Sequence, residues 1–253
     1  MLSKAKVKYI RSLERKKIRN EEQVFIAEGN KIVADMLAAE FACEWLLAKS
    51  SWMALQGDIS AKELVVAEDE DDIRKVSFLK TPQDVLGIFK KPLWDVDSFS
   101  AQGKLILALD GIQDPGNLGT ILRIADWFGI EHIVCSNDTA DVFSPKTVQS
   151  TMGALAHVKV YYTDLEAYLK EQAANGIPLF GTFLDGESLY CKDLAASGII
   201  VMGNEGQGIR PNIEALVSDR LLIPNYSDGR ETSESLNVAI ATAVVCAEFR
   251  RRL

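Results

Sequence analysis

The segment Gly203–Ile209 reads GNEGQGI and directly follows the apolar run Ile199–Met202. Two more glycine- or amide-rich segments stand in the same half of the chain, DPGNLG at Asp114–Gly119 and SLNVA at Ser235–Ala239. The loops at the carboxyl ends of parallel strands are where open α/β sheets bind ligands. We therefore expect these segments to form a pocket made largely of backbone, which suits a flat and mostly neutral ligand such as adenosine.

Length and composition describe an ordinary soluble protein. The chain has 253 residues, of which 47% are hydrophobic and 25% charged, so it can form one large domain or two ordinary ones. No apolar run reaches the roughly 20 residues that span a bilayer. The basic N-terminus has no apolar signal core behind it, and we do not expect secretion.

The cysteines and histidines argue against a metal site. The four cysteines are widely spaced, no C-x-x-C pair occurs, and the chain has only two histidines. We therefore predict reduced thiols, a cytoplasmic protein and no bound metal.

Charge is distributed unevenly along the chain. The net charge is −8, yet residues 1–20 hold eight Lys or Arg and one acid, which leaves −15 on the remainder. Such asymmetry indicates a localised anion-binding face, and it is equally typical of a solvated helix that keeps the chain soluble. On the first interpretation, Lys16, Lys17 and Arg19 are the residues we expect to contact nucleic-acid phosphates.

The pattern of apolar residues predicts two α/β units. Residues 1–95 alternate helix and strand, and residues 96–103 lose periodicity and form a linker. The second unit, 104–253, opens with the continuous apolar strand Leu105–Leu109, as expected for a parallel sheet covered on both faces. The last helix, at about Ser235–Arg251, is apolar almost all round at first, which indicates burial in this domain or against another subunit.

Polar side chains within the three segments are candidates for chemistry. We expect Asn117 to cap a helix and present its amide, and Arg123 to lie in the first or second turn, where its planar fork suits a phosphate oxygen. Glu205 supplies one carboxylate among glycines. Ser235 and Asn237 stand at a helix start, where free N–H groups form a polar cradle. Taken singly, each segment is as typical of a capped helix or a tight turn as it is of a ligand-binding site.

Taken together and in this order, the segments resemble the three signature motifs of the SpoU (TrmH-like) RNA 2′-O-ribose methyltransferases. The motifs are Asp114–Arg123, Gly203–Gly208, and Ile223-Pro224 followed by Ser235–Val238. Residues 7–29 are similar to the substrate-binding domain that precedes many of these enzymes, a small α/β fold of the ribosomal-protein type. The resemblance implies a trefoil-knotted, parallel-sheet α/β methyltransferase domain of the SPOUT superfamily, an S-adenosylmethionine cofactor, and a homodimer formed partly by the last helix.

The resemblance also implies roles for individual residues. The positions that match main-chain contacts to adenosine are Gly203, Ile223 and Leu236. The positions that match polar groups around the reacting ribose are Asn117, Arg123, Glu205, Ser235 and Asn237. The mechanism proposed for the family makes this arginine the general base. That role is demanding, because a guanidinium has a very high pKa and stays protonated at ordinary pH. We prefer Arg123 as a phosphate clamp and hydroxyl polariser, with the base unassigned and Glu205 as another candidate.

One departure from the family pattern and several alternatives remain. The connection Asn225–Glu234 is longer than usual, which leaves its role in substrate choice open. We expect methyl transfer to ribosomal RNA, with transfer RNA as the alternative substrate. A non-catalytic RNA-binding protein is disfavoured by the intact polar positions. A nucleotide-dependent oxidoreductase is disfavoured because no G-x-G-x-x-G fingerprint is present.

Overall fold

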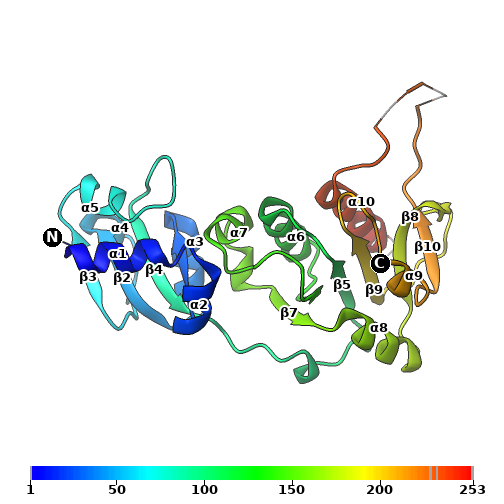
Figure 1. Ribbon diagram of the computed structural model, residues 1–253, viewed down its shortest axis with the longest axis horizontal. Coiled ribbons are helices and arrows are strands. Elements are labelled where there is room, and N and C mark those ends of the chain that lie inside the picture. Colours follow the sequence, from blue (N-terminus) through cyan, green and yellow to red (C-terminus); the bar gives the residue numbers. More distant parts are fainter. Residues whose placement is uncertain (1, 228–229, 232, 252–253) are drawn as a thin grey trace. The chain divides into compact units, whose positions relative to one another are not determined.

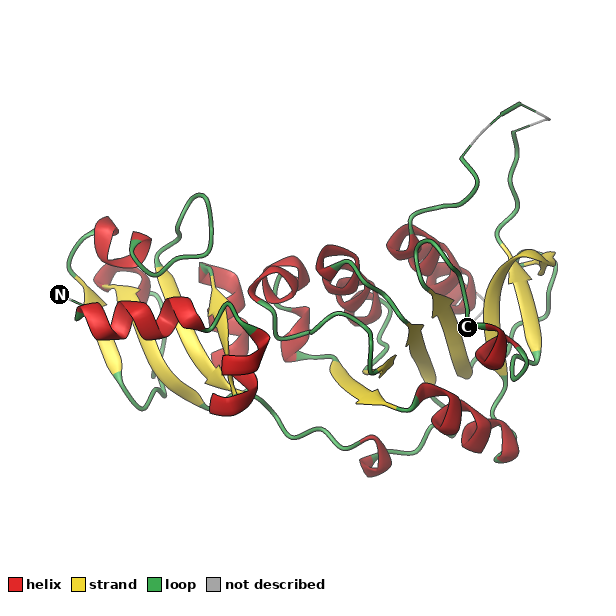
Figure 2. Ribbon diagram, in the orientation of Figure 1, coloured by secondary structure: helices red, strands yellow, loops and turns green. Residues whose placement is uncertain are grey.

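The structure is a computed structural model that describes residues 2–227, 230–231 and 233–251. It divides into two compact units, the first made of Met1–Leu93 with Asp141–His157 and the second of Trp94–Ala140 with Val158–Leu253. The segment Asp141–His157 lies between two strands of the second unit in sequence, yet it packs with the first. Figures 1 and 2 show the elements of both units.

The first unit is built on a four-stranded mixed sheet with the order β1-β4-β2-β3. Its strands are β1 (Val24–Glu28), β2 (Cys43–Lys49), β3 (Leu64–Ala67) and β4 (Val85–Lys90). Strand β4 is antiparallel to both β1 and β2, and β3 runs parallel to β2. The helices of this unit are α1 (Lys4–Ser12), α2 (Lys16–Glu22), α3 (Asn30–Ala38), α4 (Ser50–Met53), α5 (Glu70–Arg74), α7 (Pro145–Thr151) and the 3-10 turn η2 (Ala154–Ala156).

Arg19 of α2 is a buried cation in the first unit, with only 2% of its surface exposed. Its guanidinium donates hydrogen bonds to the carbonyl oxygens of Leu13 (2.8 Å) and Glu14 (2.6 Å). It also forms an ion pair with Asp141 at 2.6 Å. The guanidinium is therefore not available to an RNA phosphate, and the predicted phosphate contacts are left to Lys16 and Lys17.

The second unit contains a six-stranded sheet with the order β10-β8-β9-β5-β6-β7, and every strand pair in it is parallel. The strands are β5 (Leu105–Asp110), β6 (His132–Ser136), β7 (Lys159–Thr163), β8 (Leu179–Ser188), β9 (Gly198–Gly203) and β10 (Asp219–Leu222). The helices are α6 (Pro115–Trp127), α8 (Leu165–Ala174), α9 (Pro211–Glu214), α10 (Val238–Arg251) and the 3-10 turn η1 (Val96–Ser98). The predicted parallel-sheet α/β class is confirmed, whereas the trefoil knot stays a prediction.

Helices cover both faces of this sheet. Leu179 of β8 lies in a core cluster with Leu169 of α8 and Ile213 of α9. The next residue, Phe180, meets the ring of Phe249 on α10 edge to face at 5.0 Å. Because successive side chains of a strand point to opposite faces, α10 lies on the face opposite α8 and α9.

Helices α6 and α10 run side by side in the same direction. Near their starts, the Asn237 amide donates to Asn117 Oδ1 at 3.0 Å. At their ends, Arg250 Nε donates to the carbonyl oxygen of Phe128 at 2.7 Å. The start of the last helix is thereby held against the start of the helix that follows β5.

Within the described residues, no helix is long and apolar enough to cross a membrane.

The burial of Arg19 predicts a large effect on stability. Arg19→Met should lower the free energy of unfolding by about 3–5 kcal/mol, because it leaves the Asp141 carboxylate, 12% exposed, without its cation. Lys17→Met, at a side chain that is 83% exposed, is the control and should change stability by less than about 0.5 kcal/mol. Urea denaturation measures both, and equal small effects would contradict the structural role of Arg19.

Candidate functional site

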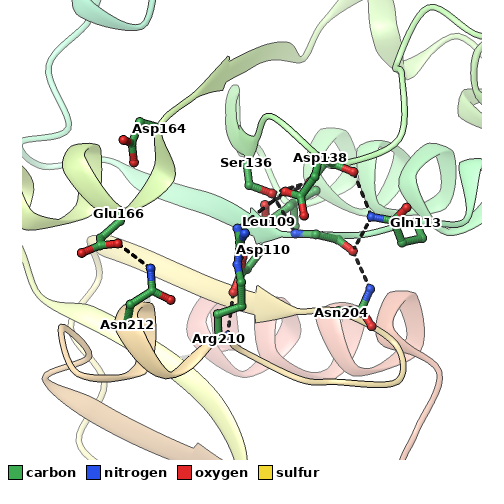
Figure 3. A network of polar contacts seen from close by, with 12 residues as sticks. Leu109, Asp110, Gln113, Ser136, Asp138, Asp164, Glu166, Asn204, Arg210 and Asn212 are labelled. Carbon is green, nitrogen blue, oxygen red and sulfur yellow. Dashed lines mark hydrogen bonds and ion pairs between the residues drawn. The ribbon is translucent and has the colours of Figure 1, made fainter.

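The site lies at the carboxyl edge of the parallel sheet, where the loops after neighbouring strands meet. Asp110, the last residue of β5, pairs in register with Gly203, the last residue of β9. The two motif loops therefore leave adjacent central strands at the same level. Figure 3 shows side chains from these loops and from the loop after β6 turned toward one another.

The loop after β9 is held in a tight turn by Asn204. The backbones of Asn204 and Gly208 exchange hydrogen bonds of 2.9 and 3.0 Å. Asn204 Oδ1 accepts from the N–H groups of Gly206 and Gln207, and its Nδ2 donates to the Gly111 carbonyl oxygen at 2.6 Å. Asn204 thus shapes its own loop and also attaches it to the loop after β5.

Gly203 is required by this turn. A Cβ atom on Gly203 would lie 2.2 Å from the Gly208 carbonyl carbon and 2.3 Å from the Ile209 nitrogen, and both are backbone atoms that cannot move aside. The packing of the protein itself therefore requires a glycine at the first position of the motif, because the loop folds back onto the end of β9.

One chain of amide and carboxylate contacts joins all three motifs. Glu205 Oε1 accepts from Asn117 Nδ2 at 3.0 Å, and Asn117 Oδ1 accepts from Asn237 Nδ2 at 3.0 Å. Glu205 and Asn237 are exposed and Asn117 is half-buried, so solvent can reach this row of contacts. Three of the predicted site residues are therefore in direct contact, although 120 positions separate Asn117 from Asn237.

The helix caps differ from those expected. Helix α6 begins at Pro115, and Asp114 caps it by accepting from the Asn117 N–H at 2.9 Å. Asn117 is therefore not the cap, and its side-chain amide is left for Glu205 and Asn237. Asn237 caps α10 by accepting from the Ala239 N–H at 3.0 Å, so that helix begins three residues later than Ser235.

The surroundings of Glu205 keep its carboxyl group ionised. Partial burial alone would raise its pKa, but the Asn117 amide and the N–H groups of Gln113 and Asp114 bond to the carboxylate and outweigh that effect. The pKa of Glu205 is consequently held below its usual value. A carboxylate with a lowered pKa accepts a proton poorly, which makes Glu205 a weak choice for the general base.

Arg123 and Ser235 stand apart from this chain of contacts. Arg123 lies in the third turn of α6, later than expected, and is about 120° around the helix axis from Asn117. Its side chain is exposed and has no hydrogen bond or ion pair with any described residue. Ser235 is also exposed, and its hydroxyl has no such bond within the described ranges.

Two of the residues that match adenosine-contacting positions are apolar and only partly covered. Ile223 follows β10 and is half-buried, and Leu236 is 49% exposed directly before Asn237. Both side chains are apolar and stand beside segments with backbone N–H groups.

Among the described residues, no group of three or more His, Cys, Asp or Glu side chains is placed to hold a metal ion.

Sequence reasoning missed an ion pair on a buried carboxylate beneath these loops. Asp110 is almost fully buried, and Arg210 donates to it from its backbone N–H at 2.8 Å and from Nε at 2.6 Å. Arg210 Nη2 also pairs with this carboxylate (Figure 3). The sequence could have indicated this pair only through the positions of its members. Asp110 ends an apolar strand, and Arg210 directly follows the glycine-rich segment.

Comparisons with known proteins identify the family of this chain. The model of the SpoU rRNA Methylase family matches residues 104–247, and that of the MRM3-like substrate binding domain matches residues 4–87. The chain belongs to the SpoU rRNA methylase family. The resemblance drawn from the three motifs and from the basic N-terminal segment is thereby confirmed.

Individual relatives of this SpoU family member match over nearly the whole chain. It is 30% identical over 246 residues to the 23S rRNA (guanosine(2553)-2′-O)-methyltransferase RlmP of Bacillus subtilis (strain 168), covering 97% of this chain and 96% of the relative. A solved structure from Porphyromonas gingivalis, described as a TrmH-family RNA methyltransferase, is 42% identical with a TM-score of 0.89 and full coverage of both chains. An AdoMet-bound rRNA methyltransferase from Sinorhizobium meliloti is 31% identical, with a TM-score of 0.85 and coverage of 100% and 97%.

The lowered pKa of Glu205 predicts a pH-dependent stability difference. At pH 7 the Glu205→Gln variant should melt at a lower temperature than the wild type, because it loses a carboxylate that the fold favours in its ionised form. That advantage should be complete above the ordinary glutamate pKa of about 4.3 and should shrink as the pH falls through the lower folded-state value. Thermal denaturation from pH 7 to pH 3 tests this, and a constant gap would contradict the assigned contacts.

Proposed function

We propose that the protein transfers a methyl group from S-adenosylmethionine to a ribose 2′-hydroxyl of ribosomal RNA, with 23S rRNA as the preferred substrate. The observation that carries the proposal is the chain of contacts Glu205–Asn117–Asn237, which joins the three motifs at the ligand-binding edge of the sheet. The names of RlmP and of the Sinorhizobium meliloti structure support the choice of reaction, RNA and cofactor.

In this proposal the cofactor is held by the turn at Gly203 and by the segments around Ile223 and Leu236. When bound, it supplies a methyl group on a positively charged sulfur. Transfer to a 2′-oxygen that has given up its proton would combine two opposite charges, so apolar side chains such as Ile223 and Leu236 would favour the reaction. The larger demand is in-line placement of the 2′-oxygen, which requires positioned polar groups.

The polar groups divide this work. Asn117 and Asn237 orient the ribose through their amides, and Ser235, two residues before Asn237, offers an exposed hydroxyl as a further donor. Arg123, exposed and free of protein partners within the described residues, clamps a phosphate and polarises the 2′-hydroxyl. Glu205 fixes Asn117, and no described residue is assigned as the base.

Arg123 is the residue whose loss should separate catalysis from cofactor binding. Arg123→Ala should abolish methyl transfer to a 23S rRNA transcript and leave the cofactor dissociation constant unchanged, because the proposed cofactor contacts lie elsewhere. Arg123→Lys keeps the charge but loses the planar fork, so it should also be strongly impaired. Single-turnover transfer and calorimetry measure the two quantities, with Lys170→Ala on α8 as a control. Wild-type turnover in either Arg123 variant would remove this residue from the mechanism.

The first unit is proposed to bind RNA through its basic N-terminal helices. Lys16 is exposed, and Lys17 has only a loose ion pair with Glu21, at 3.8 Å. The match of residues 4–87 to a substrate-binding domain supports this assignment.

Reversing the charge of these two lysines should weaken RNA binding. In Lys16→Glu/Lys17→Glu, the slope of log affinity against log salt should become shallower by about 1 for each phosphate that the protein no longer neutralises. The matched control is Lys62→Glu/Lys90→Glu, because both of those lysines already pair with Glu44. Filter binding at several salt concentrations decides between them. An unchanged slope in the first variant would leave the basic segment as a solvated helix.

Dimerisation through the last helix is proposed from apolar side chains that its own unit does not cover. Helix α10 buries Thr242, Val245 and Phe249, whereas Ile240 is 54% exposed. On the adjacent α6, Trp127 is 85% exposed. A second copy of the chain would cover these side chains.

A charge on this surface should separate the subunits. Ile240→Glu should shift the protein from dimer to monomer in sedimentation velocity at micromolar concentration, because association would then bury an unpaired carboxylate. Leu93→Glu changes another exposed apolar residue and should leave the dimer intact. A wild-type protein that sediments as a folded monomer would contradict the proposed dimer.

A further inference from the structure

The ion pair Asp110–Arg210 has no place in the chemistry described above, yet it lies directly under the site. The Asp110 side chain is 0% exposed, and Arg210 meets it with its backbone N–H, Nε and Nη2. The three contacts hold the guanidinium and the main chain of Arg210 together. Arg210 is the residue at which the glycine-rich loop ends and the chain turns into α9.

Among the described residues, the pair is one of three attachments that join the loop after β9 to the end of β5 and the loop that follows it. The second is the hydrogen bond from Asn204 Nδ2 to the Gly111 carbonyl oxygen, at 2.6 Å. The third is Glu205, which accepts from the Gln113 and Asp114 N–H groups and from Asn117. Figure 3 shows Asn204, Arg210 and Gln113 approaching the Asp110 end of β5 from different sides.

The three attachments differ in how firmly they hold. Asn204 and Glu205 lie in a loop whose outer residues, 205–208, are all exposed, so water competes for their hydrogen bonds. Asp110 is 0% exposed although the Arg210 side chain is 42% exposed, and removing the guanidinium would leave the Asp110 carboxylate buried without its cation, which makes this attachment the costly one to lose. Asp138 lies 3.6 Å from the Arg210 guanidinium and adds attraction from the loop after β6.

The geometry points to Arg210 and Asp110 as positioning residues. We propose that this pair fixes the Asn204–Ile209 loop so that Glu205 holds the Asn117 amide in place for methyl transfer. The inference rests on the proposed function, because Asn117 is assigned there to the reacting ribose. Neither Arg210 nor Asp110 touches the substrate in this account, and both act through Glu205.

A double-mutant cycle tests whether Arg210 acts through Glu205. Arg210→Met should slow single-turnover methyl transfer to a 23S rRNA transcript by roughly 100-fold, the size of effect expected for a misplaced reacting group. Glu205→Gln should slow it as well. If Arg210 works through Glu205, the double variant should be no slower than the slower single variant, because the second change removes nothing that is left.

Two further variants separate positioning from loss of fold. Arg210→Lys keeps a cation against Asp110 and should recover part of the rate lost in Arg210→Met. Lys192→Met removes a cation of the same unit that pairs with Asp219 at 2.7 Å and Glu187 at 3.3 Å, outside the site. It should leave the rate unchanged alone and in the Glu205→Gln background. All variants are compared at a temperature at which circular dichroism shows them folded.

The outcomes are distinct. Rate losses in Arg210→Met and Glu205→Gln that multiply in the double variant would overturn the inference, and so would a folded Arg210→Met with the wild-type rate. A wild-type protein that transfers no methyl group to the transcript would instead overturn the proposed function.

Discussion

The register between Asp110 and Gly203 is the constraint on which the rest of the site depends. These residues end β5 and β9, the adjacent parallel strands at the middle of the second sheet, so both motif loops start at one level. Parallel strands place the following loops at the same edge, and hydrogen bonds between side chains then join those loops. The start of α10 reaches the same place because α10 runs beside α6. A reaction that depends on placement more than on a reactive side chain suits a site held together in this way.

Charge serves different purposes in the two units. The first unit carries the basic segment of an otherwise acidic chain, but one of its cations, Arg19, is turned inward to Asp141. The partner comes from Asp141–His157, a segment that lies between β6 and β7 in sequence yet packs with the first unit. In the second unit, Arg210, whose side chain is 42% exposed, pairs with the buried Asp110. The same residue type that recognises phosphate at a surface thus stabilises a loop when a buried carboxylate faces it.

The sequence was informative about features that neighbouring residues determine. It was less informative about contacts between residues that lie far apart in the sequence. The continuous apolar strand Leu105–Leu109 correctly predicted a buried parallel sheet, and the motif order correctly predicted the family. Strand β4 contains Gly87. The structure explains that glycine, since a Cβ there would lie 2.5 Å from the Phe89 ring. The burial of Arg19 could not be predicted, because its partner is 122 residues away. The sequence predicted that the segments of Asn117 and Asn237 meet, but it did not predict the hydrogen bond between these two side chains.

The central claim is that the contacts around Asn117 serve methyl transfer to a ribose oxygen of ribosomal RNA. Its most direct test is nucleoside mass spectrometry of a 23S rRNA transcript after incubation with the purified protein and methyl-labelled S-adenosylmethionine. The account predicts that the label appears in a 2′-O-methylated ribonucleoside and is absent when Asn117 is replaced by alanine. Label found on a nucleobase, or 2′-O-methylation that persists unchanged in the Asn117→Ala variant, would contradict it.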